Sequence, residues 1–135
     1  MHPLAGTWIA NLSKSHRHTN HQFHSATMRF AVTGQEVSLS YEGINHEGRP
    51  ESNTHVLHAD GEEHAIAAAP GFVAVSTLGV RWVESVGKKD GAVVGRGRYE
   101  VSDDGQTMTA TVAGIDASGK PFEQVIAFDR LIENC

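Results

Sequence analysis

Apolar and polar residues alternate along much of the chain with a period of two. Residues 24–32 set His24, Ala26, Met28, Phe30 and Val32 against Ser25, Thr27, Arg29 and Ala31. The same alternation occurs over residues 37–41, 106–112 and 122–130. Because successive side chains of a β-strand point to opposite faces, each segment predicts a strand with one buried face. No window of helical length has apolar residues three and four positions apart without a glycine break, so we predict an all-β chain.

Turn signals separate these segments. Asp60-Gly61, Asp90-Gly91 and Asp104-Gly105 each lie between strand-like runs, and Asp-Gly favours hairpin turns because both central residues tolerate positive φ. We predict about ten strands, a number that follows from their spacing, at residues 5–12, 22–33, 36–44, 51–59, 63–68, 72–77, 80–87, 92–101, 106–114 and 120–131. Consecutive hairpins predict a single domain over residues 1–135, an up-and-down antiparallel β-barrel of about 8–10 strands.

Charge and composition exclude several classes of partner. The formal net charge is −5, from 11 basic and 16 acidic residues, which argues against nucleic acid and against anionic membrane surfaces. No apolar run approaches the ~20 residues of a membrane span. The only cysteine is Cys135, so no intrachain disulfide is expected. The first residues show no signal peptide, which predicts a cytoplasmic protein, or a secreted or periplasmic one if a leader has been removed.

The two ends of the chain carry a family signature. Gly6-Thr7-Trp8 resembles the Gly-x-Trp motif that opens lipocalins and fatty-acid-binding proteins, members of the calycin superfamily. Arg130 resembles the basic residue that those proteins place across the tryptophan. The resemblance implies a lipocalin-like or fatty-acid-binding-protein-like barrel in which Trp8 and Arg130 form a structural cation–π contact.

A closer resemblance is to a group of small, uncharacterised bacterial lipocalin-like proteins. It rests on Gly6 to Ser15, on Lys88 to Thr109 ("KKDGAVVGRGRYEVSDDGQTMT") and on Gly114 to Arg130 ("GIDASGKPFEQVIAFDR"). The resemblance implies the fold and little about function. The chain departs from this group in the histidine-rich segment 16–24, and it lacks the helical lid of intracellular fatty-acid carriers.

Nine histidines are the main peculiarity of the composition, and His16, His18, His21 and His24 lie close together. Imidazoles on the same side of a strand are reasonable ligands for a metal ion or a haem iron. No neighbouring cysteine or carboxylate completes such a site. We therefore interpret the segment as a solvated loop, with a metal or haem site as the alternative.

Three residues are candidate catalytic groups. His24 has the parity of Met28 and is expected to point into the barrel, where an imidazole serves as a general acid or base. Of His55 and His58 only one can point inward, and the position of Val56 favours His58. Tyr41 is the third candidate.

The candidate ligand-binding residues are Met28, Phe30, Leu39, Trp82, Glu84, Arg96, Tyr99 and Phe128. Arg96 and Arg98 share one face of their strand. Turned inward they would bind a carboxylate or phosphate, whereas turned outward they form a solvated ladder, which we favour because charged residues are seldom buried unpaired. The alternation leaves open which faces of strands 80–87 and 92–101 point inward.

The leading hypothesis is a protein that binds a small, largely hydrophobic or aromatic molecule in the barrel. The alternative is a cofactor-independent lyase, isomerase or cyclase that uses a cavity histidine. No nucleophile elbow, P-loop, dinucleotide fingerprint or zinc-protease motif occurs, and no cofactor is expected. Pairing into a homodimer stays open.

Overall fold

The computed structural model describes the backbone of residues 2–16, 23–45, 47–65, 71–115 and 119–131, with all of their side chains except those of 12–16, 23 and 24. Ten strands account for most of it: β1 (Gly6–His16), β2 (Phe23–Thr33), β3 (Glu36–Asn45), β4 (Pro50–His58), β5 (Asp60–Ala65), β6 (Phe72–Leu78), β7 (Trp82–Lys89), β8 (Ala92–Val101), β9 (Thr107–Ile115) and β10 (Pro121–Arg130). None of the described residues is helical, so the described chain offers no helix that could span a bilayer. The predicted all-β fold is confirmed.

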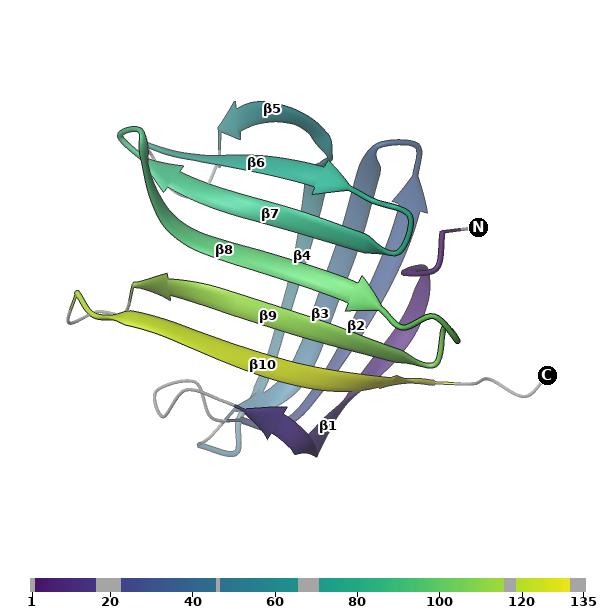
Figure 1. Cartoon of the computed structure of the whole chain (residues 1–135). Coiled ribbons are helices and arrows are strands. Elements are labelled where there is room, and N and C mark those ends of the chain that lie inside the picture. The colour runs from purple at the N-terminus through teal and green to yellow at the C-terminus, as the bar shows by residue number, and fades with distance from the viewer. Residues whose placement is uncertain (1, 17–22, 46, 66–70, 116–118, 132–135) are drawn as a thin grey trace.

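The strands form one antiparallel sheet with the order β4-β3-β2-β1-β10-β9-β8-β7-β6-β5. In Figure 1, β5–β10 run across the front of the molecule and β1–β4 pass behind them. Pairing of β1 with β10 joins these two layers on one side. The edge strands β4 and β5 meet on the other side without a hydrogen-bonded ladder between them in the described residues. The result is a nearly closed up-and-down barrel.

Two of the predicted Asp-Gly turns adopt different backbone structures, one a hairpin and the other a bulge. Asp90 and Gly91 have φ values of 52° and 84° and connect the paired residues Lys89 and Ala92, as in a two-residue type I′ hairpin. The prediction of a hairpin at Asp60-Gly61 is wrong. Gly61, with a φ of 78°, lies in a register shift near the start of β5. A bulge also requires a residue with positive φ, so the dipeptide alone did not distinguish the two.

The hydrophobic core lies at the end of the barrel where β1 begins and β10 ends. Its largest fully buried side chains, hereafter the base cluster, are Leu4, Trp8, Val37, Val83, Val101, Met108 and Phe128. The indole Nε1 of Trp8 donates to the carbonyl of Leu4 at 2.9 Å. Gly6 has a φ of 131°, and a Cβ there would lie 2.8 Å from a guanidinium nitrogen of Arg130. The glycine of the Gly-x-Trp motif is therefore required by the close approach of Arg130.

Arg130 seals this end, as the sequence predicts. Its Nε donates to the carbonyl of Gly105 at 2.7 Å, and its two terminal nitrogens donate to Ala5 at 3.0 Å and Pro3 at 2.6 Å. The guanidinium carbon lies 4.2 Å from the ring centroid of Trp8. The predicted cation–π contact is confirmed, and it ties both ends of the described chain to the base.

Candidate functional site

Beyond the base cluster, several inner positions of β6–β9 carry residues with little or no side chain, although Phe72 and Val112 share the inner parity. The pairing register sets the face, because directly opposed residues of neighbouring strands lie on the same side of a sheet. Starting from buried Val83, which pairs with Tyr99, the inner positions continue with Ser85 opposite Gly97 and Gly87 opposite Gly95. We call this surface the glycine wall; its members are Ala74, Ser76, Ser85, Gly87, Gly95, Gly97 and Gly114.

Three glycines of this wall have room beside them on the inner face, whereas a Cβ on Gly114 would meet the Phe122 ring at 3.2 Å. A Cβ atom built on Gly87 would meet a single carbonyl oxygen at 3.9 Å, and one on Gly95 a single carbonyl oxygen at 3.6 Å. A Cβ on Gly97 would meet only the ring of Tyr99, at 3.9 Å and beyond. The φ values of these three glycines are outside the left-handed region. Backbone conformation therefore does not require glycine here, and what distinguishes these positions is the room that they leave inside the barrel.

Polar side chains gather on the inner face of β3 and β4, which pass behind β7–β9 in Figure 1. Tyr41 pairs with Asn53, and Leu39 pairs with His55. We call Tyr41, Asn53 and His55 the polar wall. Asn53 and His55 are solvent exposed although they lie on the inner face, as expected if no side chain of the opposite wall covers them.

Tyr41 lies flat along the inner face. A Cβ on Gly43 would be 2.6 Å from the Tyr41 hydroxyl, so the ring lies over this glycine. Partial burial, and secondarily the negative charge of Glu51, raise the pKa of Tyr41 above its usual value. The hydroxyl therefore stays protonated near neutral pH and is available as a hydrogen-bond donor.

Further polar groups border the same space. Ser76 donates a hydrogen bond to Ser85 across the glycine wall at 3.0 Å. The Tyr99 ring packs edge-on against Phe30, with 5.4 Å between the ring centroids. Burial raises the pKa of Tyr99. On β5, His64 pairs with Ala74, but its ring is held by Asp60 at 2.9 Å and lies beside the outward His58.

Five of the predicted ligand-binding residues lie on the inner face, at the floor of this space. Met28, Phe30, Leu39 and Phe128 are buried members of the core, and Tyr99 packs against them. Their role in binding is not tested by the fold.

The other three predicted ligand-binding residues face outward, which corrects the assignment. Trp82 pairs with Glu100, Glu84 with Arg98, and Val86 with Arg96, all on the face opposite buried Val83. Small inner residues explain the error: the inner positions of β7 and β8 carry glycine and serine, so side-chain size there does not reveal the buried face.

The outward residues instead form the solvated ladder that the sequence favours. Arg98 lies between Glu84 at 3.5 Å and Glu100 at 3.6 Å. Its guanidinium carbon also lies 4.3 Å from the ring centroid of Trp82. These contacts form a network on the outer face of the sheet, opposite the glycine wall.

The preference for His58 over His55 is also wrong. His58 pairs with Glu36 on the outer face, whereas His55 pairs with Leu39 on the inner face. Val56 was a misleading neighbour, because it too lies on the outer face and is 49% exposed. The His58 ring lies 5.1 Å from that of His64, at the junction of β4 and β5.

The histidine-rich segment falls largely outside the described residues. His18 and His21 are not described, and neither are the side chains of His16 and His24. Within the described part of the chain, no group of three histidine, cysteine, aspartate or glutamate side chains could hold a metal ion. The metal hypothesis thus depends on side chains outside the described part of the structure.

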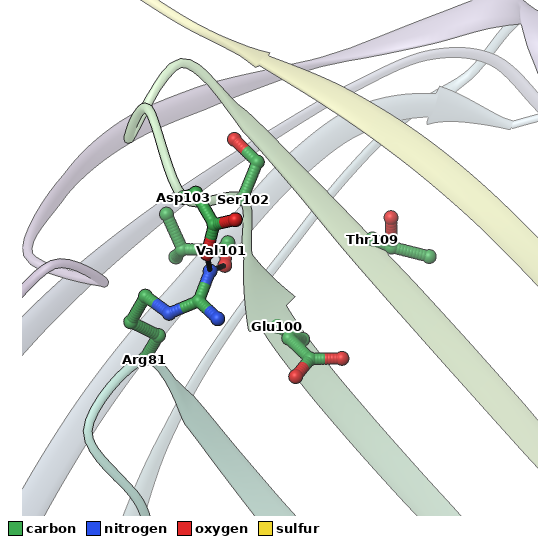
Figure 2. A pocket seen from close by; sticks show the side chains of 6 residues that line it. All are labelled: Arg81, Glu100, Val101, Ser102, Asp103 and Thr109. Carbon is green, nitrogen blue, oxygen red and sulfur yellow. Dashed lines mark hydrogen bonds and ion pairs between the residues drawn. The ribbon is translucent and has the colours of Figure 1, made fainter.

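One hollow on the outer surface is an alternative place to look for a ligand (Figure 2). It measures about 390 Å³ and lies beside the turn that follows β8. Arg81 donates to the carbonyl of Val101 at 3.0 Å and forms an ion pair with Asp103 at 2.6 Å. Because its one cation is already paired and Glu100 adds a further negative charge, this hollow is a poor site for an anion or an apolar molecule.

Sequence reasoning missed the glycine wall, Asn53 and the Ser76–Ser85 pair. The signal that could have found the wall is Gly95-Arg96-Gly97, where glycine occupies alternate positions inside a strand. Glycine in the interior of a strand often marks the close approach of a ligand or another backbone.

The fold matches solved structures. The crystal structure of the wild-type fluorescent protein UnaG has a TM-score of 0.63 at 17% identity, and covers 95% of this chain and 97% of its own. A point mutant of UnaG gives 0.64 at 17% identity, with 97% and 98% covered. Zebrafish ileal bile acid-binding protein, solved with cholic acid, gives 0.60 at 8% identity, with 96% and 99% covered.

These likenesses show that the chain shares the up-and-down β-barrel fold of those proteins and nothing finer. No protein-family model matches the chain, and no curated protein matches it either.

Proposed function

We propose that this protein binds one small, largely hydrophobic or aromatic molecule inside the barrel, between the glycine wall and the polar wall. The base cluster would form the floor of the site. Burying apolar ligand surface against it contributes roughly 25 cal/mol per Å². The polar wall would then orient the ligand through a few hydrogen bonds, which is the usual division of labour in small-molecule sites.

The observation that carries this proposal is the set of inner glycines that backbone conformation does not demand. A barrel interior of this size is ordinarily filled by side chains or occupied by one small ligand. Gly87, Gly95 and Gly97 leave room on the inner face, since a Cβ on each would meet described atoms at no less than 3.6 Å. The zebrafish protein, whose fold is similar, was solved with cholic acid.

A matched pair of substitutions on β8 tests the proposal. Gly97→Phe places a ring in the inner space, whereas Arg96→Phe adds the same ring to the outer face of the same strand. We expect Gly97→Phe to weaken binding of the neutral fluorophore Nile red at least about tenfold, or about 1.4 kcal/mol, and Arg96→Phe to leave it unchanged. Equal effects of the two substitutions on the fluorescence titration would contradict binding inside the barrel.

We also expect the untagged protein to retain a bound ligand through purification. Native mass spectrometry, compared with the denatured mass, would reveal an organic molecule retained through purification. A metal mass would instead favour the site at His16, His18, His21 and His24.

Catalysis by His24 and Tyr41 is the second candidate function. The position of Tyr41 on the inner face favours it, and its raised pKa suits a donor to a developing oxyanion rather than a base. Loss of turnover in His24→Ala with the fold intact would separate this function from binding. A single domain over residues 1–135, a cytoplasmic location and pairing into a homodimer stay predictions of the sequence.

A further inference from the structure

We infer that the barrel selects an uncharged ligand with hydrogen-bonding groups and rejects a carboxylate. This inference rests on the proposed function and specifies the chemistry of the molecule bound at that same site. It follows from the position of the described cations relative to the inner face.

The described cations are nearly all turned away from the inner space. Arg96 and Arg98 lie on the outer face of β8, and Arg29 pairs with Glu42 outside β2 at 3.4 Å. Lys88 reaches Glu63 on the outer face at 3.4 Å. Charged side chains on this part of the barrel thus satisfy one another outside it.

Within the strands whose side chains are described, Arg130 and Lys89 are the cations of inner parity, and neither is placed to hold a buried anion. Arg130 is below the floor, with all three kinds of guanidinium nitrogen donating to backbone carbonyls. Lys89 is at the tip of the β7–β8 hairpin, exposed, with its ammonium 5.2 Å from the ring centroid of Phe72. A carboxylate between the two walls would therefore lose water without a described cation beside it, which disfavours it relative to a neutral group.

The charge that does act on the inner space is negative. Glu51 pairs with Gly43 on the inner face of β4, near the end opposite the base, and accepts a hydrogen bond from Asn45 at 3.0 Å. Its charge reaches the Tyr41 hydroxyl, where it disfavours the phenolate. The same field would disfavour a ligand carboxylate placed beside Tyr41.

The remaining inner groups suit neutral partners. The Tyr41 hydroxyl, the Asn53 amide and the His55 imidazole each can donate and accept hydrogen bonds. The Ser76–Ser85 pair offers the same chemistry on the glycine wall. Hydroxyl, carbonyl, ester or amide groups on an otherwise apolar ligand would satisfy them.

Matched neutral and acidic probes test the inference at pH 8, above the range in which histidine usually titrates. Methyl cholate and cholate form one pair, and 1-dodecanol and dodecanoate form the other. Each probe is titrated against bound Nile red, and the loss of Nile red fluorescence measures how well the probe competes. We expect the neutral member of each pair to compete at a concentration at least about tenfold lower.

The outcomes distinguish failure of the proposed binding function from failure of the proposed selectivity. If Nile red does not bind to the inner wall, the proposed function fails. If it binds, and either acid competes as well as its neutral counterpart or no neutral probe competes, the inference fails while the binding function stands.

A pair of substitutions on β4 supplies the converse test. Asn53→Arg puts a cation on the polar wall, opposite Tyr41, whereas Thr54→Arg puts one on the outer face, opposite Ser40. We expect Asn53→Arg to shift the preference toward dodecanoate by about tenfold and Thr54→Arg to leave it unchanged. Equal shifts in both variants would show that overall charge, not the inner wall, sets the selectivity.

Discussion

The two ends of the barrel differ in the size of the side chains on their inner faces. At the base, the inner positions carry large side chains, and Trp8, Met108 and Phe128 are almost completely buried. β7 and β8 contribute Val83 and Val101 to this packed end, whereas their inner positions farther along are Ser85, Gly87, Gly95 and Gly97. One continuous hydrogen-bonded sheet therefore supports a packed core at one end and a lined space at the other.

The pattern of backbone hydrogen bonds therefore does not decide which end of the barrel is filled by large side chains. Both ends are built from antiparallel pairs with inward–outward alternation, although β7 and β8 shift register between Gly87 and Lys88. What differs is inner side-chain volume. Stability should therefore be concentrated at the base, and substitutions at the glycine wall should change binding with little change in stability.

The largest expected effect is at the base. Trp8→Ala removes a fully buried ring, its hydrogen bond to Leu4 and its contact with Arg130. We expect a loss of about 3–5 kcal/mol in the free energy of unfolding, measured by urea denaturation. Trp82→Ala, at a partly exposed outer position, is the control, and we expect it to cost about 1 kcal/mol. Similar losses for both tryptophans would remove the distinction between base and outer surface.

A smaller effect should distinguish turn glycines from wall glycines. Gly91 has a φ of 84°, so Gly91→Ala forces a side chain into the left-handed region and should cost about 1 kcal/mol. Gly97 has no such φ and has room for a methyl group, so Gly97→Ala should be neutral or stabilise by up to about 0.5 kcal/mol. Equilibrium unfolding in urea measures both. A destabilising Gly97→Ala would mean that the wall glycine has a packing role.

The smallest effect concerns the two tyrosines, the only ones in the chain. Burial raises the pKa of Tyr99, and burial with the Glu51 charge raises that of Tyr41. A raised pKa means that folding favours the neutral phenol, so its contribution is present below pH 10.0, the ordinary value, and is lost as pH rises through the folded pKa.

Stability should therefore fall above about pH 10, and Tyr99→Phe should reduce that fall. Absorbance titration of the single-tyrosine variants assigns each phenol. A folded Tyr99 that ionises at its ordinary pKa would show that water reaches its hydroxyl, and would move the floor of the site deeper.

Much of the fold could be predicted from local patterns. Alternation in residues 24–32 and 37–41 places Met28, Phe30 and Leu39 on the buried face, where the structure has them. The Gly-x-Trp resemblance correctly paired Trp8 with Arg130 across the chain. These predictions succeed because large apolar side chains, or a specific motif, mark the inner face.

The site was harder to predict, because its inner residues are small or polar. On β8, glycines alternate with Arg96 and Arg98, so hydrophobicity does not identify the inner face. On β4, Val56 suggested the wrong parity because an edge strand can expose an apolar side chain. Asp60-Gly61 predicts a hairpin but forms a bulge, because a glycine with positive φ suits both structures.

The sequence by itself determined the strands and the turns, since period-two alternation and positive-φ residues act within a few positions of the chain. Only the tertiary structure decided which face of β4, β7 and β8 lines the interior. That choice depends on the register between strands, which propagates from the packed base, where Val83 meets Tyr99 and Val101 meets Met108, to positions whose own side chains carry no signal. The glycine wall faces inward because the base cluster holds the strands in that register.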